Sequence, residues 1–255
     1  MKNYFGKFAT VLALGSAVLL FGTTTKDALA DSFNVTYLNP GVQTPTGITS
    51  NYETFDGQSF NGTTNFNNSS ITGTYTGYQI ESAGQYGAAG GTGNYISVPN
   101  GGSYTLNLSS AINYFGLWFS ALDAGNELSF YNGNTLVETF SPTDYAQLVG
   151  ACPTTAASPN YCGNPNSNFS GQNSGQQYAY LNFYDTTGTF DKIVFSENPA
   201  VGEFESDNQA VAMLNPGTTL PGTPLTGVTP EPSSFILLGT GLLGAAGAIR
   251  RRLAV

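Results

Sequence analysis

Residues 103–140 read SYTLNLSSAINYFGLWFSALDAGNELSFYNGNTLVETF, and apolar residues alternate with polar ones over 103–108 and again over 113–121. Alternate side chains of a β-strand point to opposite faces, so each segment is predicted to be a strand with one face to bury. Farther along, Asn-Gly-Asn at 132–134 separates two apolar segments, and these residues tolerate the positive φ that a tight turn needs. The stretch therefore predicts consecutive antiparallel strands.

Similar short segments, rich in Tyr, Phe, Val, Ile and Thr, recur on both sides of this stretch with turn residues between them. We expect about nine strands, from the candidate segments 33–38, 71–80, 95–98, 103–108, 113–121, 127–131, 135–140, 178–184, 190–196 and 211–214. Many short strands without regular intervening helices are typical of a sandwich. The predicted fold is all-β, an antiparallel, jelly-roll-like β-sandwich that forms one body over residues 31–214.

The body is strongly acidic. Fourteen of the sixteen acidic residues lie between residues 31 and 229, against one basic residue, Lys192, which gives this part a formal charge of −13. Nucleic-acid binding depends on basic side chains that neutralise phosphates, so this class of partner is excluded. Abundant Gly, Asn, Ser, Thr and Tyr give a neutral, hydrogen-bonding, aromatic surface. Such a surface suits sugars, but it is also the composition of matrix proteins that bind nothing in particular.

Residues 1–30 have the pattern of a secretory signal peptide. Two lysines precede an apolar run at 8–21, and Ala28 and Ala30 supply small residues at the cleavage positions. Signal peptidase is therefore expected to leave a chain that starts at Asp31. An N-terminal membrane anchor is the alternative, but the run of about 14 residues is shorter than the roughly 20 that a spanning helix needs.

The C-terminal end carries a short motif, an apolar run and a basic cluster, in that order. They are Pro230, Glu231 and Pro232, then residues 233–249, then Arg250, Arg251 and Arg252. A helix over the apolar run is roughly 25 Å long at 1.5 Å per residue, which spans a membrane with local thinning. The arginines would stay on the cytoplasmic side and hold the body outside. Residues 215–229, rich in Pro, Gly and Thr, are predicted to be a spacer between body and helix.

The C-terminal sequence TPEPSSFILLGTGLLGAAGAIRRR, residues 229–252, resembles the PEP-CTERM sorting signal of exosortase-dependent proteins in Gram-negative bacteria. The resemblance implies recognition of the Pro-Glu-Pro motif by an integral-membrane exosortase, removal of the tail, and release or attachment at the cell surface. Parts of the body, such as FDKIVFSEN at 190–198 and GEFESDNQAV at 202–211, also resemble one group of such surface proteins. A sortase motif is the alternative at 220–224, but Pro224 replaces its glycine.

Cys152 and Cys162 are the only two cysteines. Export into an oxidising compartment predicts a disulfide between them, within a long loop over residues 150–177. Two thiols without any histidine in the chain do not complete a zinc site, so a metal or redox role for the pair is not expected.

The densest group of acids is Glu203, Glu205 and Asp207, and alternation places all three on one side of an extended segment. Carboxylates that converge repel one another unless they face water or share a hard cation such as calcium. In jelly-roll carbohydrate modules the first and last strands often lie side by side and share a calcium ion. By this analogy Glu53 and Asp56 are predicted to join Glu205 and Asp207 as calcium ligands.

A hydrolase is the competing class, because two carboxylates suffice for glycoside cleavage. The sequence singles out no pair among its many acids. It also lacks histidine, has no arginine in the body and has no Gly-x-Ser-x-Gly elbow, which removes most acyl- and phosphoryl-transfer schemes. We therefore expect no enzymatic activity and no catalytic residues.

Together these observations predict an exported protein that an inner-membrane anchor holds transiently before it reaches the cell surface or the extracellular space. The expected role is that of a structural surface or extracellular-matrix component. The alternative is a lectin-like, calcium-dependent module that binds exopolysaccharide. The expected partners are signal peptidase, an exosortase-type membrane enzyme and, in the alternative, a polysaccharide.

Overall fold

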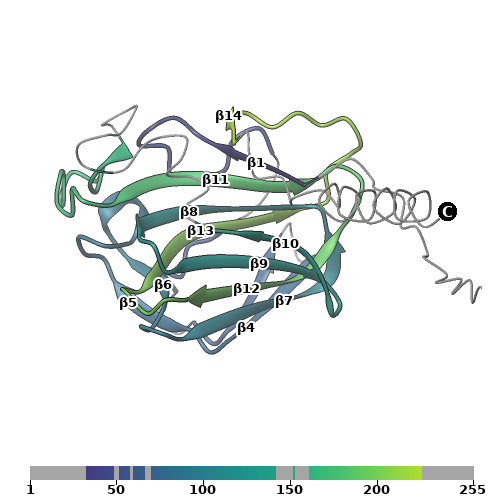
Figure 1. The fold of residues 1–255 in the computed structure, drawn as a ribbon, viewed down its shortest axis with the longest axis horizontal. Coiled ribbons are helices and arrows are strands. Elements are labelled where there is room, and N and C mark those ends of the chain that lie inside the picture. Colours follow the sequence, from purple (N-terminus) through teal and green to yellow (C-terminus); the bar gives the residue numbers. More distant parts are fainter. Residues whose placement is uncertain are drawn as a thin grey trace, which may run out of the picture.

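The computed structural model describes residues 33–48, 52–57, 60–66, 70–141, 152 and 161–225. In this part the chain is all-β, and every strand pair is antiparallel within two sheets that face each other (Figure 1). The predicted signal peptide and C-terminal helix lie outside the described residues. Within those residues the search for an apolar helix long enough to cross a membrane finds none.

The larger sheet has eight strands. Seven follow one another in the order β14 (Thr223–Pro224), β1 (Phe33–Tyr37), β11 (Gln177–Asp185), β8 (Tyr114–Leu122), β13 (Phe204–Ala212), β6 (Asn94–Val98) and β5 (Gln79–Ser82), and β2 (Tyr52–Glu53) also pairs with β13. The central strands β8 and β13 are buried along their whole length. Both faces of this sheet are therefore covered at its centre.

The smaller sheet has six strands and covers one face of the larger one. Their order is β10 (Thr135–Phe140), β9 (Asn126–Asn132), β12 (Phe190–Glu197), β7 (Ser103–Ile112), β4 (Ile71–Thr76) and β3 (Thr63–Phe66). The predicted hairpin is confirmed, because Asn132 pairs with Thr135 and Gly133 turns with φ of 58°. The all-β, two-sheet architecture is thus confirmed, and the jelly-roll-like connectivity stays a prediction.

Aromatic side chains fill the space between the sheets. Phe195 of β12 stacks on Tyr104 with ring centroids 4.0 Å apart, and it meets Phe204 of the opposite sheet at 5.3 Å. Trp118 points away from this core to the outer face of the larger sheet, where it is 1% exposed in a second apolar cluster with Tyr178. Burial under this cover makes Trp118 a packing residue and not an exposed platform for a ligand.

The predicted disulfide between Cys152 and Cys162 is present, with a Cα–Cα distance of 5.5 Å. Cys162 also forms an isolated β-bridge with Gln177 at the start of β11. The cross-link therefore ties the long loop to a central strand of the larger sheet.

The body extends past its predicted end at Leu214. Leu220 and Leu225 are buried, and the short strand β14 pairs with β1. The amide of Leu225 donates a hydrogen bond to the carbonyl of Val35 at 2.8 Å. Residues 220–225 of the predicted spacer are thus packed as part of the body, because they cover an edge that β1 would otherwise expose.

Candidate functional site

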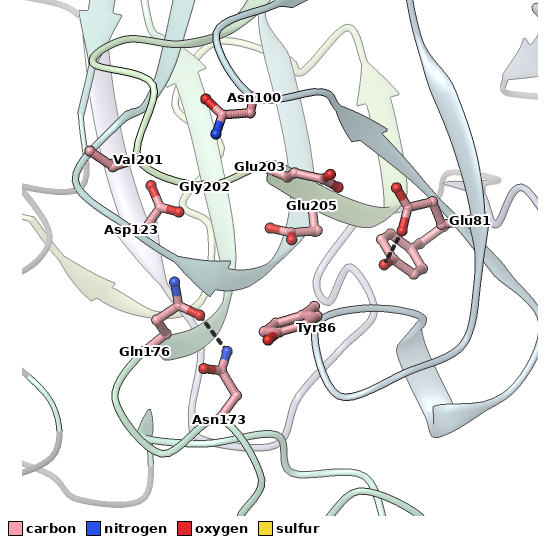
Figure 2. Close-up of a pocket in the computed structure, with 11 residues that line it drawn as sticks. Glu81, Tyr86, Asn100, Asp123, Asn173, Gln176, Val201, Gly202, Glu203 and Glu205 are labelled. Atoms are coloured by element: carbon pink, nitrogen blue, oxygen red, sulfur yellow. Dashed lines mark hydrogen bonds between the residues drawn. The ribbon is translucent and has the colours of Figure 1, made fainter.

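A cleft of about 550 Å³ opens on the outer face of the larger sheet, at the end where β8 stops and β11 and β13 begin. Its lining contains four carboxylates, two tyrosines and three amide side chains. These residues are Glu81, Asp123, Glu203 and Glu205, then Tyr86 and Tyr95, then Asn100, Asn173 and Gln176, with Val201 and Gly202 completing the wall. Figure 2 shows the acidic side chains and the Tyr86 ring around one common space.

The acidic side of the cleft is built by strand alternation. Phe204 points into the core, so Glu205, the next residue of β13, points outward into the cleft. Across the sheet, Tyr95 and Ser97 of β6 hold Glu81 of β5, because their hydroxyls donate hydrogen bonds to its carboxylate at 2.9 and 3.1 Å. These contacts fix Glu81 at the far wall of the cleft.

Hydrogen bonds between loops form the opposite wall. Asn173 has a positive φ of 53°, and its side-chain amide donates to Gln176 and, at 2.8 Å, to the hydroxyl of Tyr178. The Tyr178 hydroxyl donates in turn to the carbonyl of Gln85 at 2.7 Å. The next residue, Tyr86, is 44% exposed and presents its ring to the cleft (Figure 2).

Burial and mutual repulsion shape the protonation of these acids. The pKa of Glu205 is raised to about 9, mainly by burial and in smaller part by the charges of Asp123, Glu203 and Glu81. Burial also raises the pKa of Asp123 to about 6, against the lowering effect of a hydrogen bond from the Gly125 amide. The pKa of Glu203 is raised by burial first and then by its hydrogen bond to Glu81. The cleft therefore brings together acids whose ionised forms it stabilises poorly.

One oxygen in this cleft has no partner among the described residues. Glu205 is 6% exposed, and its Oε2 atom is buried without a hydrogen bond. A buried carboxylate oxygen without a partner is costly, and in native proteins such a group is explained by strain, by a functional role, or by a bound water or ion. Glu205 is therefore the acid of the cleft whose hydrogen bonding the described residues leave incomplete.

The four predicted calcium ligands do not meet in one place. Glu205 lines the cleft, whereas Asp207 accepts hydrogen bonds from the amides of Ala89 and Asn208 at 2.7 and 2.6 Å. The charges of Asp56 and Glu53 reach Asp207 and add to the rise in its pKa, of which burial is the main cause.

The other two predicted ligands are also engaged with the backbone. Glu53 accepts a hydrogen bond from the Phe55 amide at 2.8 Å, and Asp56 accepts one from the Asn94 amide at 2.8 Å. In the described part of the chain, no three acids are grouped as metal ligands. Calcium binding by this protein stays a prediction, without an assembled four-carboxylate site.

Sequence reasoning identified Glu203 and Glu205 as a notable acidic pair but missed their partners. Glu81 and Asp123 are isolated acids in the sequence, and they reach the cleft only through strand pairing. Tyr86 lies in a glycine-rich turn that carries no distinguishing pattern. The remaining predicted residues, the signal-cleavage alanines and the Pro-Glu-Pro and arginine groups of the tail, lie outside the described residues.

The comparison with protein families identifies the C-terminal end. The PEP-CTERM protein-sorting motif matches residues 228–252, so the chain carries this sorting motif at its C-terminal end. The motif implies that the protein is exported, processed by exosortase, a membrane enzyme, and sorted to the cell surface. No curated protein and no solved structure matches the chain.

Proposed function

We propose that the β-sandwich body is a glycan-binding module that works at the cell surface after exosortase-dependent sorting. The observation that carries this proposal is the cleft of about 550 Å³, which lies within the range of about 300–1,000 Å³ for small-ligand sites. It combines one exposed aromatic ring with amide and carboxylate groups. This combination matches a sugar ring, which offers an apolar face for stacking and hydroxyls for hydrogen bonds.

The binding role excludes some glycans by charge. Four carboxylates line the cleft, and the body carries a single lysine. A polysaccharide rich in uronic acid or sulfate would meet like charges across the cleft, and such contacts are unfavourable. The proposal is therefore restricted to neutral or basic glycans.

In this proposal the body binds without catalysis. Two carboxylates suffice for glycoside cleavage and the cleft has four, so the absence of catalysis needs a test of its own. Reducing-sugar release by the purified protein from a range of polysaccharides would contradict this part of the proposal.

The ends of the chain deliver the module. Signal peptidase would cut after Ala30, and the apolar run at 233–249 would hold the chain in the inner membrane until exosortase acts near Pro230. This sequence of events predicts a transient membrane-bound precursor. Pulse-chase labelling in the host should detect it, and deletion of the tail should remove it.

Affinity electrophoresis tests the binding function. The full-length chain, purified in detergent, is run through gels that contain the host exopolysaccharide or a panel of neutral and basic glycans. We expect retardation on at least one glycan, and a loss of about tenfold in affinity, or about 1.4 kcal/mol, for Tyr86→Ala, because the ring buries apolar area against the sugar. Tyr52→Ala is the matched control, since Tyr52 is also exposed, at 38%, but does not line the cleft.

If no glycan is bound, a structural role in the matrix would be the remaining interpretation. If no glycan retards the protein, the module proposal is wrong and the cleft has another ligand or none. Retardation that is equal for wild type and Tyr86→Ala would move the binding site away from the cleft. Dependence of retardation on added calcium would restore the calcium-dependent form of the lectin-like alternative.

A further inference from the structure

The unpartnered Glu205 oxygen restricts the ligand further than the shape of the cleft does. Glu205 Oε2 is buried without a hydrogen bond among the described residues, and it belongs to a side chain that lines the cleft. Its strand neighbour Ser120, paired with it across β8 and β13, also has a buried hydroxyl without a partner. Ser120 is fully buried and does not line the cleft, whereas Glu205 does, so a ligand group with hydrogen-bond donors at this end of the cleft would meet Glu205.

The acidic residues around Glu205 favour one kind of hydrogen-bond donor over another. Glu81, Asp123 and Glu203 also line the cleft, and no basic side chain does. A neutral hydroxyl donates one hydrogen bond and leaves the repulsion between carboxylates unchanged. A protonated amine donates three and also supplies the positive charge, which makes its hydrogen bonds to carboxylates about twice as strong as neutral ones.

A bare metal ion fits this arrangement less well. Calcium requires six to eight oxygens at 2.3–2.6 Å, but in the described residues no three acids are grouped closely enough to serve as its ligands. An ammonium group needs no such convergence, because it can reach separate carboxylates from different sides. The spread of the acids around one space thus favours an organic cation.

We propose that the cleft recognises a sugar that bears a protonated primary amine, as in a polymer of de-N-acetylated hexosamine. The ammonium lies against Glu205, with Glu81, Asp123 and Glu203 around it, and the sugar ring stacks on Tyr86. This inference rests on the proposed glycan-binding function and names the chemical class of the glycan. In the empty cleft burial keeps the pKa of Glu205 high, and a neighbouring ammonium lowers it again by stabilising the carboxylate.

Titration calorimetry with two matched sugars tests the inference. The full-length chain in detergent at pH 6.5 and low salt is titrated with a β-1,4-linked glucosamine hexamer, and separately with the N-acetylglucosamine hexamer of the same length. We expect the amine-bearing hexamer to bind at least about tenfold more tightly, and added salt to reduce this preference, because it depends on charge.

Variants that remove one charge but keep the shape of the side chain show which residue causes the preference for the amine. Glu205→Gln keeps the shape of the side chain but removes its charge, and it should abolish most of the preference for the amine. Glu203→Gln is a second variant in the same cleft at a less buried position, in case Glu205→Gln folds poorly. Glu127→Gln removes one charge from the smaller sheet and should leave both affinities unchanged.

Each outcome decides the question. Equal binding of the two hexamers, or tighter binding of the acetylated one, would overturn the amine inference and leave the glycan-binding function in place. Failure of both hexamers while another glycan binds would do the same. Absence of binding to any glycan would overturn both proposals. Binding of spermidine as tight as that of the glucosamine hexamer would show recognition of a cation without a sugar, and tight calcium binding that Glu205→Gln abolishes would assign the cleft to a metal.

Discussion

Ser120 and Glu205 face each other across neighbouring strands β8 and β13, and each has a buried oxygen without a hydrogen-bond partner among the described residues. Neither side chain satisfies the other. In a core that pairs nearly all of its polar groups, two such atoms side by side destabilise the unliganded fold. Of the two residues only Glu205 lines the cleft, so a ligand there would supply a partner to Glu205, while Ser120 stays covered.

The pH dependence of stability should report the state of Glu205. The pKa of this carboxyl rises from 4.5 to about 9 in the folded protein, through burial and the nearby charges of Asp123, Glu203 and Glu81. Between these values the folded state holds more protons than the unfolded state. The stabilising contribution is therefore complete below pH 4.5 and is lost as the pH rises toward 9, with a slope of at most about 1.4 kcal/mol per pH unit.

Thermal unfolding between pH 6.5 and 9 measures this effect. We expect the melting temperature of the wild type to fall more steeply over this range than that of Glu205→Gln, because glutamine does not titrate and the contribution of Asp207, whose pKa burial also raises, is common to both proteins. The range lies above the pKa of about 6 of Asp123, so that group adds little to the slope. Parallel curves for the two proteins would mean that Glu205 is already ionised in the fold at neutral pH.

Removal of the disulfide should destabilise the body. Cys152 and Cys162 are ten residues apart, and closing a loop of this size stabilises the fold by about 2–3 kcal/mol in the chain-entropy model. The free energy of unfolding of the double variant Cys152→Ser, Cys162→Ser should therefore be lower by this amount, and guanidinium denaturation measures it. A reductant should lower the wild type to the level of the variant and leave the variant unchanged. A reductant effect on the variant would point to a cause other than this bond.

The packed C-terminal segment yields a prediction about the end of the body. Leu225 is 7% exposed, and replacement of a buried leucine by alanine costs about 2–5 kcal/mol. We expect Leu225→Ala to cost about 2 kcal/mol in denaturant unfolding, the low end, because the residue lies at a sheet edge. Leu136→Ala, at a leucine 52% exposed, should change stability by less than about 0.5 kcal/mol. If Leu225→Ala changed the free energy of unfolding as little as Leu136→Ala, residues 215–229 would be better described as a spacer that does not pack on the body.

This packing also limits the geometry of sorting. Only residues 226–229 separate Leu225 from the motif at Pro230, and five extended steps at 3.3–3.6 Å reach about 17 Å. Exosortase would therefore act within this distance of β14 unless that strand is released. If exosortase acts at Pro230, the edge formed by β14 and β1 would consequently lie near the enzyme during processing.

The sequence predicted the strands whose two faces differ clearly. The alternation over 113–121 and the Asn-Gly-Asn turn led directly to β8 and to the β9–β10 hairpin, because local periodicity and turn chemistry determine them. β13 was predicted to begin at 211, yet it begins at Phe204. After Phe204 the first half of the strand is polar on both faces, since Ser206 faces the core and Glu205 faces the cleft, so no apolar alternation marks it.

The site was less accessible to sequence reasoning, because it depends on long-range pairing. Glu203 and Glu205 stand out as neighbouring acids, but Glu81 is more than 120 residues away and reaches them through β5 and β6. Asp207, although it belongs to the same acidic group, is held by the Ala89 amide outside the cleft lining. Spacing along one strand defines a shared face, but it does not say which other elements will cover each part of that face.

The strand that carries Glu205 is held by a buried network that offers a last test. The Gln209 side chain accepts a hydrogen bond from the Tyr75 hydroxyl at 2.9 Å and donates to the Tyr104 hydroxyl at 2.8 Å and to Ser206 at 3.0 Å. The two tyrosines belong to the smaller sheet, so the network joins the sheets directly beneath the cleft strand. It lies beside the register shift between Asp207 and Ala210.

Loss of Gln209 should therefore cost more than loss of any single bond that it makes. We expect Gln209→Leu to destabilise the body by about 2–4 kcal/mol, because buried hydroxyls are left unsatisfied, and Tyr75→Phe to cost about 1 kcal/mol. In the double variant the two costs should not add, since both changes remove the same hydrogen bond. Tyr75→Phe also removes the hydroxyl that Gln209→Leu alone would leave without a partner. Chemical denaturation of the wild type, the two single variants and the double variant measures this coupling. Additive costs would show that Tyr75 and Gln209 act independently, which would contradict the hydrogen bond between the sheets.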